Sequence, residues 1–151
     1  FETETLKPKT LTHKPVTSQL ENTPIRNPGG ETATILVVED NPDNMITIKA
    51  VLQDRYRILE ATDGEAGLQM AEQAKPDLIL LDMALPKMDG FTVVRKLKGK
   101  TGLRNIPVIS MTAQVMKGDR EKILAAGCDD YIAKPIDPES ATKKISEWLK
   151  G

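Results

Sequence analysis

The amino-acid sequence predicts an α/β fold built on a doubly wound, five-stranded parallel sheet. From residue 33 onward, short apolar runs alternate with stretches whose apolar residues recur every three or four positions, as strands and crossover helices do. The run at 78–81 has four consecutive apolar residues, which is typical of a strand buried on both faces. Polar residues directly follow several of these runs, and open α/β folds place their sites at the carboxyl ends of strands.

Five strands are expected, each an apolar or β-branched run bounded by polar or turn residues: 35–38, 56–60, 77–82, 106–111 and 130–133. The stretches of helical spacing that follow them are at about 42–52, 64–75, 90–98, 115–126 and 138–149. Right-handed crossovers with helices on both faces favour the strand order 2-1-3-4-5, which gives a flavodoxin-like three-layer sandwich with five helices.

Local signals support the helix starts. Asn41 fits an N-cap with Pro42 at the first helical position, and residues 137–139 repeat this pattern of cap, proline and acid. The helix at 115–126 is the least convincing, because Gly118 inside it costs about 1 kcal/mol relative to alanine. The last helix is expected to bury four apolar side chains: Ala141, Ile145, Trp148 and Leu149.

Residues 1–32 differ from the domain expected at 33–151. They hold four of the ten prolines, and their isolated apolar residues match neither the helical nor the strand period, which favours a flexible linker. The alternative is an extended arm that docks these apolar residues on a neighbouring domain. Because the chain starts with Phe1 rather than methionine and has no secretory signal pattern, we expect a segment of a longer protein.

Composition excludes several classes of partner. The 21 basic and 22 acidic residues nearly balance, so net charge indicates neither a nucleic acid nor an anionic membrane as a partner. The sequence has no apolar run near the roughly 20 residues that span a bilayer. The single cysteine, Cys128, fits a reducing cytosol and is expected to be a small buried filler. These features predict a cytoplasmic segment without direct membrane contact, whose parent protein could itself be membrane-anchored.

The polar residues at the predicted strand ends come from four strands: Glu39 and Asp40, then Asp82, Thr112 and Lys134. Because the strands are parallel, these ends share one edge of the sheet. Three carboxylates meeting there would repel one another strongly unless a cation lay among them. Hard oxygen ligands with room for several waters suit Mg²⁺, with Mn²⁺ as a possible substitute. Zinc is a poor fit, because the only histidine, His13, lies in the linker.

The same residues suit phosphoryl transfer. A carboxylate oxygen of Asp82 can attack phosphorus to form an acyl phosphate. Catalysis of such a transfer consists mostly of positioning and of neutralising the charge on three equatorial oxygens. A magnesium ion, the Lys134 ammonium and the Thr112 hydroxyl could each interact with one of these oxygens.

Short motifs occur in order at the strand ends: Val38-Glu39-Asp40-Asn41, Leu81-Asp82 with Pro86 and Met88-Asp89-Gly90, Met111-Thr112-Ala113, and Asp130-Tyr131-Ile132-Ala133-Lys134-Pro135. With these motifs, the chain from about residue 33 to 149 resembles the response-regulator receiver domains of two-component signalling. The resemblance implies that Asp82 accepts a phosphoryl group from a histidine kinase, acting in cis or in trans, or from a histidine phosphotransfer protein. It implies at most slow self-dephosphorylation by the domain itself.

The resemblance also implies roles for further residues. Glu39, Asp40 and Asp82 would bind Mg²⁺ together with the backbone carbonyl of Ala84. The Lys134–Pro135 bond is expected to be cis.

Thr112 and Tyr131 match the switch pair of the family. After phosphorylation Thr112 would move toward the phosphate and Tyr131 would turn inward, which changes the surface of the fourth helix, fifth strand and fifth helix. Tyr131 could alternatively be a half-buried packing residue.

Rival functions fit less well. An enzyme of the haloacid-dehalogenase type needs a second aspartate two residues after the acceptor, where this chain has Ala84. A dinucleotide-binding module needs a glycine fingerprint, but the first strand–helix turn at 39–42 is acidic. A degenerate receiver that acts only as a binding module is disfavoured by the complete set of acids, threonine and lysine. The expected context is the carboxyl-terminal receiver of a hybrid histidine kinase, with a stand-alone single-domain regulator as the alternative.

Overall fold

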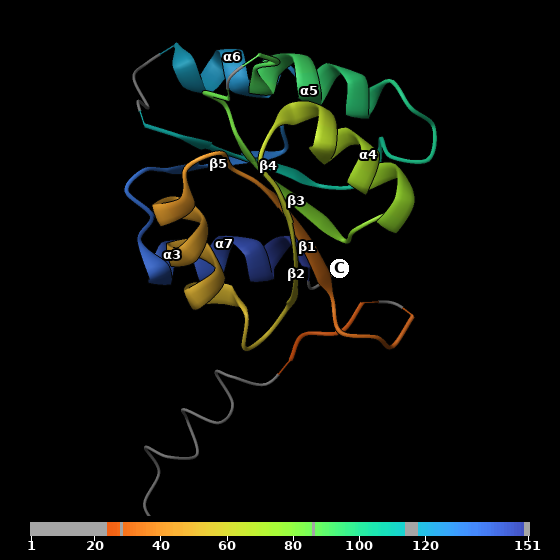
Figure 1. Cartoon of the computed structure of the whole chain (residues 1–151), viewed down its shortest axis with the longest axis vertical. Coiled ribbons are helices and arrows are strands. Elements are labelled where there is room, and N and C mark those ends of the chain that lie inside the picture. The colour runs from red at the N-terminus through yellow and green to blue at the C-terminus, as the bar shows by residue number, and fades with distance from the viewer. Residues whose placement is uncertain (1–23, 28, 86, 114–117, 150–151) are drawn as a thin grey trace, which may run out of the picture.

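A computed structural model describes residues 24–27, 29–85, 87–113 and 118–149 of the chain (Figure 1). The strands are β1 (Thr34–Val38), β2 (Arg57–Ala61), β3 (Leu78–Asp82), β4 (Val108–Thr112) and β5 (Asp130–Ala133). The helices are α3 (Pro42–Leu52), α4 (Gly64–Ala74), α5 (Gly90–Lys98), α6 (Asp119–Ala125) and α7 (Pro138–Leu149). Strands and helices alternate along the chain, as the sequence predicts.

The five strands form one parallel sheet in the order β2-β1-β3-β4-β5, which confirms the predicted doubly wound topology. β3 lies at the centre between β1 and β4, and all five of its residues are buried. Its last residue, Asp82, pairs in register with Met111 of β4, so Asp82 and Thr112 end on the same edge.

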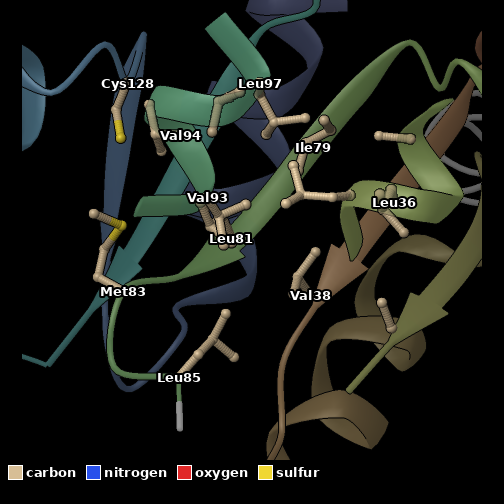
Figure 2. Close-up of a cluster of buried hydrophobic side chains, with 14 of the residues drawn as sticks. Leu36, Val38, Ile79, Leu81, Met83, Leu85, Val93, Val94, Leu97 and Cys128 are labelled. Carbon is tan, nitrogen blue, oxygen red and sulfur yellow. The ribbon is translucent and has the colours of Figure 1, made fainter. Parts of the chain in front are cut away.

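Alternate residues of the central strands pack on opposite faces of the sheet. In β1, Leu36 and Val38 belong to the hydrophobic cluster under α4, α5 and α6, which Figure 2 shows in part. Ile35 and Val37 belong to a second cluster under α3 and α7. Figure 1 shows the resulting three layers, with α3 and α7 on one side of the sheet and the other helices on the opposite side. Burial on both faces explains why these strands are apolar throughout.

Three predicted strands begin one or two residues later than expected, and one of them is β3, which begins at Leu78 rather than at residue 77. β4 begins at Val108 rather than at residue 106, because Pro107 has no N–H to donate to a neighbouring strand, although its carbonyl accepts from Ile79 N at 2.9 Å. β2 begins after Tyr56, whose N–H donates to the carbonyl of Leu52 at 3.0 Å and so closes the turn after α3.

Two expectations about helices are wrong. Gly118 does not lie inside α6 but at its N-cap, with φ 107°, a backbone conformation that favours glycine. Residues 115–117 of that predicted helix lie outside the described residues. Trp148 is not core packing of α7: it is 38% exposed, and its indole N–H donates to Asp130 Oδ2 at 2.9 Å. Of the four apolar residues expected inside, Ala141 and Ile145 are buried, and Leu149 is partly buried.

The residues before β1 form a short hairpin on the amino-terminal edge of the sheet, opposite the edge where Asp82 lies. Ile25 N donates to the carbonyl of Arg55 at 2.9 Å, Ala33 N donates to the carbonyl of Ile25, and Ile25 packs against the cluster under α3 and α7. Asp77 joins this hairpin to the sheet, because its Oδ2 accepts from Thr34 N at 2.7 Å and from Asn27 Nδ2 at 3.4 Å. The part of the predicted linker nearest the domain therefore packs on the domain.

Among the described residues, no helix combines the length and apolar character that crossing a membrane requires.

We predict that Asp77→Ala lowers the free energy of unfolding by about 1–3 kcal/mol, because it leaves the N–H of Thr34 without its charged acceptor. It should also speed amide exchange at Ile25 and Ala33. Urea unfolding and hydrogen exchange measure the two effects. Asp54→Ala, at an exposed aspartate after α3, is the control. Equal stability of the two variants would contradict the role of Asp77.

Candidate functional site

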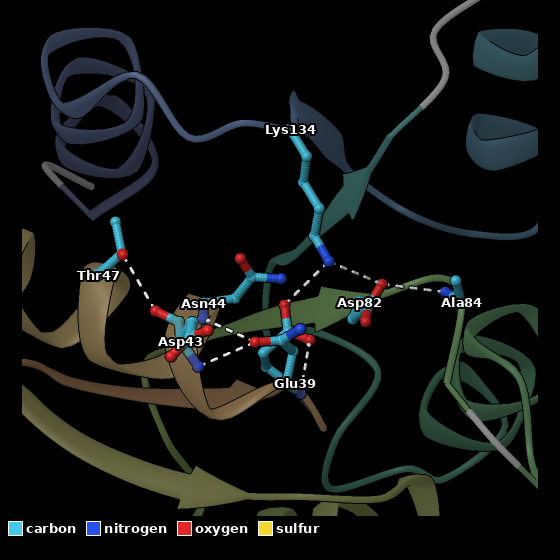
Figure 3. Close-up of polar contacts among 8 residues, drawn as sticks. Glu39, Asp43, Asn44, Thr47, Asp82, Ala84 and Lys134 are labelled. Carbon is cyan, nitrogen blue, oxygen red and sulfur yellow. Dashed lines mark hydrogen bonds and ion pairs between the residues drawn. The ribbon is translucent and has the colours of Figure 1, made fainter.

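Three charged side chains meet at the carboxyl-terminal edge of the sheet (Figure 3): Glu39 after β1, Asp82 at the end of β3 and Lys134 after β5. The backbone places each of them. Glu39 N donates to the carbonyl of Ala61 at 2.9 Å, and Lys134 N donates to the carbonyl of Thr112 at 2.8 Å, so both residues extend the strand pairing. The predicted convergence of these residues is therefore observed.

Asp40 completes a group of carboxylates at this edge. One oxygen each from Glu39, Asp40 and Asp82 lies within 4.8 Å of the others. Glu39 and Asp82 are 1% and 3% exposed, whereas Asp40 is exposed to solvent. Buried Glu39 Oε1 lies 2.9 Å from Lys134 Nζ. An all-oxygen donor set, partly buried and partly open to water, fits a hard divalent cation such as Mg²⁺.

The Lys134 ammonium lies between two of the acids. Its Nζ is 2.9 Å from Glu39 Oε1 and 3.3 Å from Asp82 Oδ1. The Lys134–Pro135 peptide bond is cis, as the resemblance implies. Lys134 therefore supplies positive charge directly beside the side chain of Asp82.

Burial and pairing act in opposite directions on these groups. Burial raises the pKa of Glu39, and the nearby Asp82 adds to this, although the hydrogen bond from Lys134 opposes it. Burial acts to lower the pKa of Lys134. Its hydrogen bonds with Glu39 and Asp82, and the negative charges of these two acids, have the larger effect, so the pKa of Lys134 is raised. Lys134 accordingly remains an ammonium at neutral pH.

Two backbone N–H groups orient the acids. Ala84 N donates to Asp82 Oδ1 at 3.0 Å, and Asn41 N donates to Glu39 Oε2 at 3.2 Å. Asn41 is also the N-cap of α3, as the sequence predicts, with its side-chain oxygen accepting from the N–H groups of Asp43 and Asn44. Ala84 thus contacts Asp82 through its N–H. The metal-binding role of the Ala84 carbonyl stays a prediction.

Thr112 and Tyr131 lie on the neighbouring strands. Thr112 is the half-buried last residue of β4 and pairs in register with Ala133. Tyr131 is half-buried in β5, and its ring packs against the cluster under α4, α5 and α6. The structure thus places Thr112 at the edge that carries Asp82, and Tyr131 two residues before Ala133 along the adjacent strand.

Residues 35–146 match the family model described as "Response regulator receiver domain". The chain belongs to this family. This finding confirms the resemblance that the strand-end motifs indicate.

Relatives of the receiver domain agree with this assignment. The chain is 38% identical over 117 residues to the polar-differentiation response regulator DivK of Brucella anthropi, across 77% of this chain and 95% of that protein. It is similar to the receiver domain of the sensor histidine kinase PA1611 from Pseudomonas aeruginosa PAO1, whose crystal structure has a magnesium ion coordinated in the active-site cleft. That match has a TM-score of 0.74 and 37% identity, and covers 79% of this chain and 98% of the other.

A third relative is the signal receiver domain of a signal transduction histidine kinase from Syntrophus aciditrophicus. It has a TM-score of 0.73 and 33% identity, and the match covers 79% of this chain and 91% of that chain.

The turn that follows Asp82 in this receiver domain depends on Gly90, which sequence reasoning treated only as part of a motif. A Cβ built at Gly90 would lie 2.7 Å from the Met83 Cα and 2.9 Å from the Asp82 carbonyl oxygen. Only glycine therefore lets α5 start directly against the end of β3. A glycine at the first position of a helix, directly after the N-cap Asp89, is the sequence signal for such a close approach.

Sequence reasoning also missed the residues around Tyr131. Arg120 of α6 and Lys144 of α7 place cationic groups beside its ring. The sequence signal for the contact from α7 was the four-residue spacing of Lys144 and Trp148, which puts both side chains on one face of that helix.

We predict that Gly90→Ala destabilises the receiver by about 1–3 kcal/mol, because the new methyl group overlaps backbone atoms that cannot move without displacing Asp82. Chemical unfolding measures the loss. Gly102→Ala is the matched control, since its Cβ would meet only Lys75 side-chain atoms at 3.8 Å or more. A Gly90 variant as stable as this control would refute the steric argument.

Proposed function

We propose that this receiver domain takes a phosphoryl group from a phosphohistidine onto Asp82 in a Mg²⁺-dependent reaction, and then relays it or changes its surface for a partner. The observation that carries the proposal is the environment of the Asp82 carboxylate. It is almost fully buried, lies in a group of three acids within 4.8 Å, and has the Lys134 ammonium 3.3 Å away.

The two oxygens of Asp82 take different roles in this proposal. Oδ1 accepts the N–H of Ala84 and pairs with Lys134, so we assign the attack to Oδ2. A new bond forms between Oδ2 and phosphorus as the bond from phosphorus to the histidine nitrogen breaks. The electron pair of that broken bond stays with the departing imidazole. The product is an aspartyl phosphate, an acyl phosphate.

Charge neutralisation is the main catalytic requirement. When bound, Mg²⁺ would supply positive charge to the transferring oxygens, held by Glu39, Asp40, Asp82 and the carbonyl of Ala84, with Mn²⁺ as a substitute. Lys134 can pair with a second phosphoryl oxygen without moving far, because its Nζ already contacts Asp82. The Thr112 hydroxyl would donate to a third. The magnesium-bound receiver of PA1611 supports this arrangement.

The response to phosphorylation would pass through Thr112 and Tyr131. Movement of the Thr112 side chain toward the phosphoryl group would leave space beside it, and the Tyr131 ring would turn inward to fill that space. Since Tyr131 lies in β5 between α6 and α7, this movement would alter the surface of those three elements.

The partner is a histidine kinase core, in cis or in trans, or a histidine phosphotransfer protein. Two of the relatives are receivers of histidine kinases, which favours a hybrid kinase as the parent protein. The match to 95% of DivK favours the alternative, a stand-alone regulator. Both contexts would place the domain in the cytoplasm.

To find the phosphodonor, the domain is incubated with a panel of autophosphorylated kinase cores and phosphotransfer proteins. The hybrid context predicts fastest transfer from the kinase core encoded upstream of Phe1. Absence of a kinase core upstream, together with fast transfer from a separate protein, would favour the stand-alone regulator instead. Either result identifies the donor.

We predict that incubation with Mg²⁺ and acetyl phosphate adds one acid-stable, base-labile phosphoryl group to the wild type, and that Asp82→Asn abolishes the addition. Chelation of Mg²⁺ should slow the reaction by at least about tenfold, because the charge of the transferring group is then uncompensated. Intact-mass spectrometry before and after base treatment follows the product.

Asp54→Asn is the matched control, since it removes an exposed carboxylate at the far end of α3 and should leave phosphorylation unchanged. Circular dichroism confirms that Asp82→Asn is folded. Equal labelling of the wild type and the Asp82 variant, or none in the wild type, would refute the proposed function.

A further inference from the structure

The ring of Tyr131 lies beside two cationic side chains from two different helices. Lys144 Nζ of α7 is 4.7 Å from the ring centroid, and the guanidinium carbon of Arg120 of α6 is 5.9 Å from it. Both distances are within the range of cation–π attraction, although Arg120 is near its limit. Figure 1 shows α6 and α7 on opposite sides of β5, so Tyr131 is contacted from both helix layers.

Lys144 is held in place by three contacts. Its Nζ donates to the backbone carbonyl of Tyr131 at 2.7 Å, pairs with Asp130 Oδ1 at 3.3 Å, and lies over the Tyr131 ring. The ammonium has three donors and a compact charge, so these contacts can be made together. Lys144 thereby joins α7 to both the backbone and the side chain of Tyr131.

Asp130 fixes the position of Lys144. Its Oδ1 also accepts the N–H of Tyr131 at 2.8 Å, and its Oδ2 accepts the indole N–H of Trp148 at 2.9 Å. Burial acts to raise the pKa of Asp130, but the hydrogen bonds from Trp148 and Tyr131 and the charge of Lys144 outweigh it and lower this pKa. Asp130 is therefore ionised at neutral pH and keeps the ammonium beside the ring.

We propose that Lys144 is a positioning residue that holds the Tyr131 ring in its half-exposed place while Asp82 carries no phosphoryl group, with Arg120 as a weaker second contact. This inference rests on the proposed function, in which the ring turns inward after phosphorylation. Inward rotation takes the ring away from both cations. Loss of these contacts opposes the switch, so Lys144 sets how readily the phosphorylated conformation is populated.

The size of the effect follows from the interaction. A cation–π contact at a partly exposed site changes an equilibrium constant by about two- to fivefold. Lys144→Met keeps the length and most of the apolar stem of the side chain but removes the charge. It should therefore shift the unphosphorylated domain toward the inward ring position by about this factor.

The test uses beryllofluoride with Mg²⁺ as a stable mimic of the phosphoryl group on Asp82. Fluorine NMR measures its apparent affinity, and carbon-13 labelling of the two tyrosines reports the position of the Tyr131 ring. We expect Lys144→Met to raise the apparent affinity about two- to fivefold and to move the ring signal of the free protein toward its beryllofluoride-bound position. Lys144→Arg should behave nearly as wild type.

Two further variants separate positioning of the ring from a purely structural role. Lys143→Met, at the exposed neighbouring lysine of α7, should leave the affinity and the ring signal unchanged. In a Tyr131→Leu background, Lys144→Met should no longer change the affinity. If its effect persists there, Lys144 acts through Asp130 or the backbone, and the proposal is overturned.

An unchanged affinity and ring signal in Lys144→Met would also overturn the proposal. Failure of the proposed function gives a different result, because the wild type itself would then not bind beryllofluoride. In that case the ring signal of the free protein still decides whether Lys144 positions Tyr131: a shift in Lys144→Met supports it, and no shift overturns it.

Discussion

The charge balance around Lys134 is the constraint on which the rest of the site depends. Glu39 and Asp82 are almost fully buried, and a buried carboxylate without a partner carries a large desolvation penalty. The ammonium of Lys134 contacts both acids and offsets part of this penalty. One ammonium cannot neutralise three carboxylates, so the group retains negative charge. That residual charge favours a divalent cation, and a cation at this place is what transfer of an anionic phosphoryl group requires.

A parallel sheet is well suited to maintain this balance. Its strands deliver their carboxyl ends to one edge, and strand pairing continues through Glu39 and Lys134, which fixes the backbone of both residues. The acids and the lysine are therefore held by main-chain hydrogen bonds instead of by mobile loops. Close approach of α5 at Gly90 completes the support beneath Asp82. Preorganisation of this kind reduces the rearrangement that the reaction needs.

The two ends of the sheet and its β5 edge serve different purposes. The carboxyl end carries the acids, whereas the amino end carries the hairpin that Asp77 joins to β1. The connection to upstream residues is thus remote from the reacting atoms. At the β5 edge, Tyr131 contacts side chains of α6 and α7 through their cationic groups. Cation–π contacts of this kind are weaker than the main-chain pairing that holds the residues around Asp82.

By itself, the sequence determined the alternation of strands and helices, the parallel topology, and the strand-end positions of Glu39, Asp40, Asp82, Thr112 and Lys134. These features follow from local periodicity and from the rule that parallel strands share an edge. The tertiary structure alone decided where Gly118 and Trp148 lie, how residues before β1 pack, and which cations flank Tyr131. Local spacing allowed Trp148 to be buried, but its hydrogen bond with Asp130 of β5 keeps it at the surface. The physical reason is common to all of these cases: each depends on a partner distant in sequence or on a backbone conformation that periodicity does not specify.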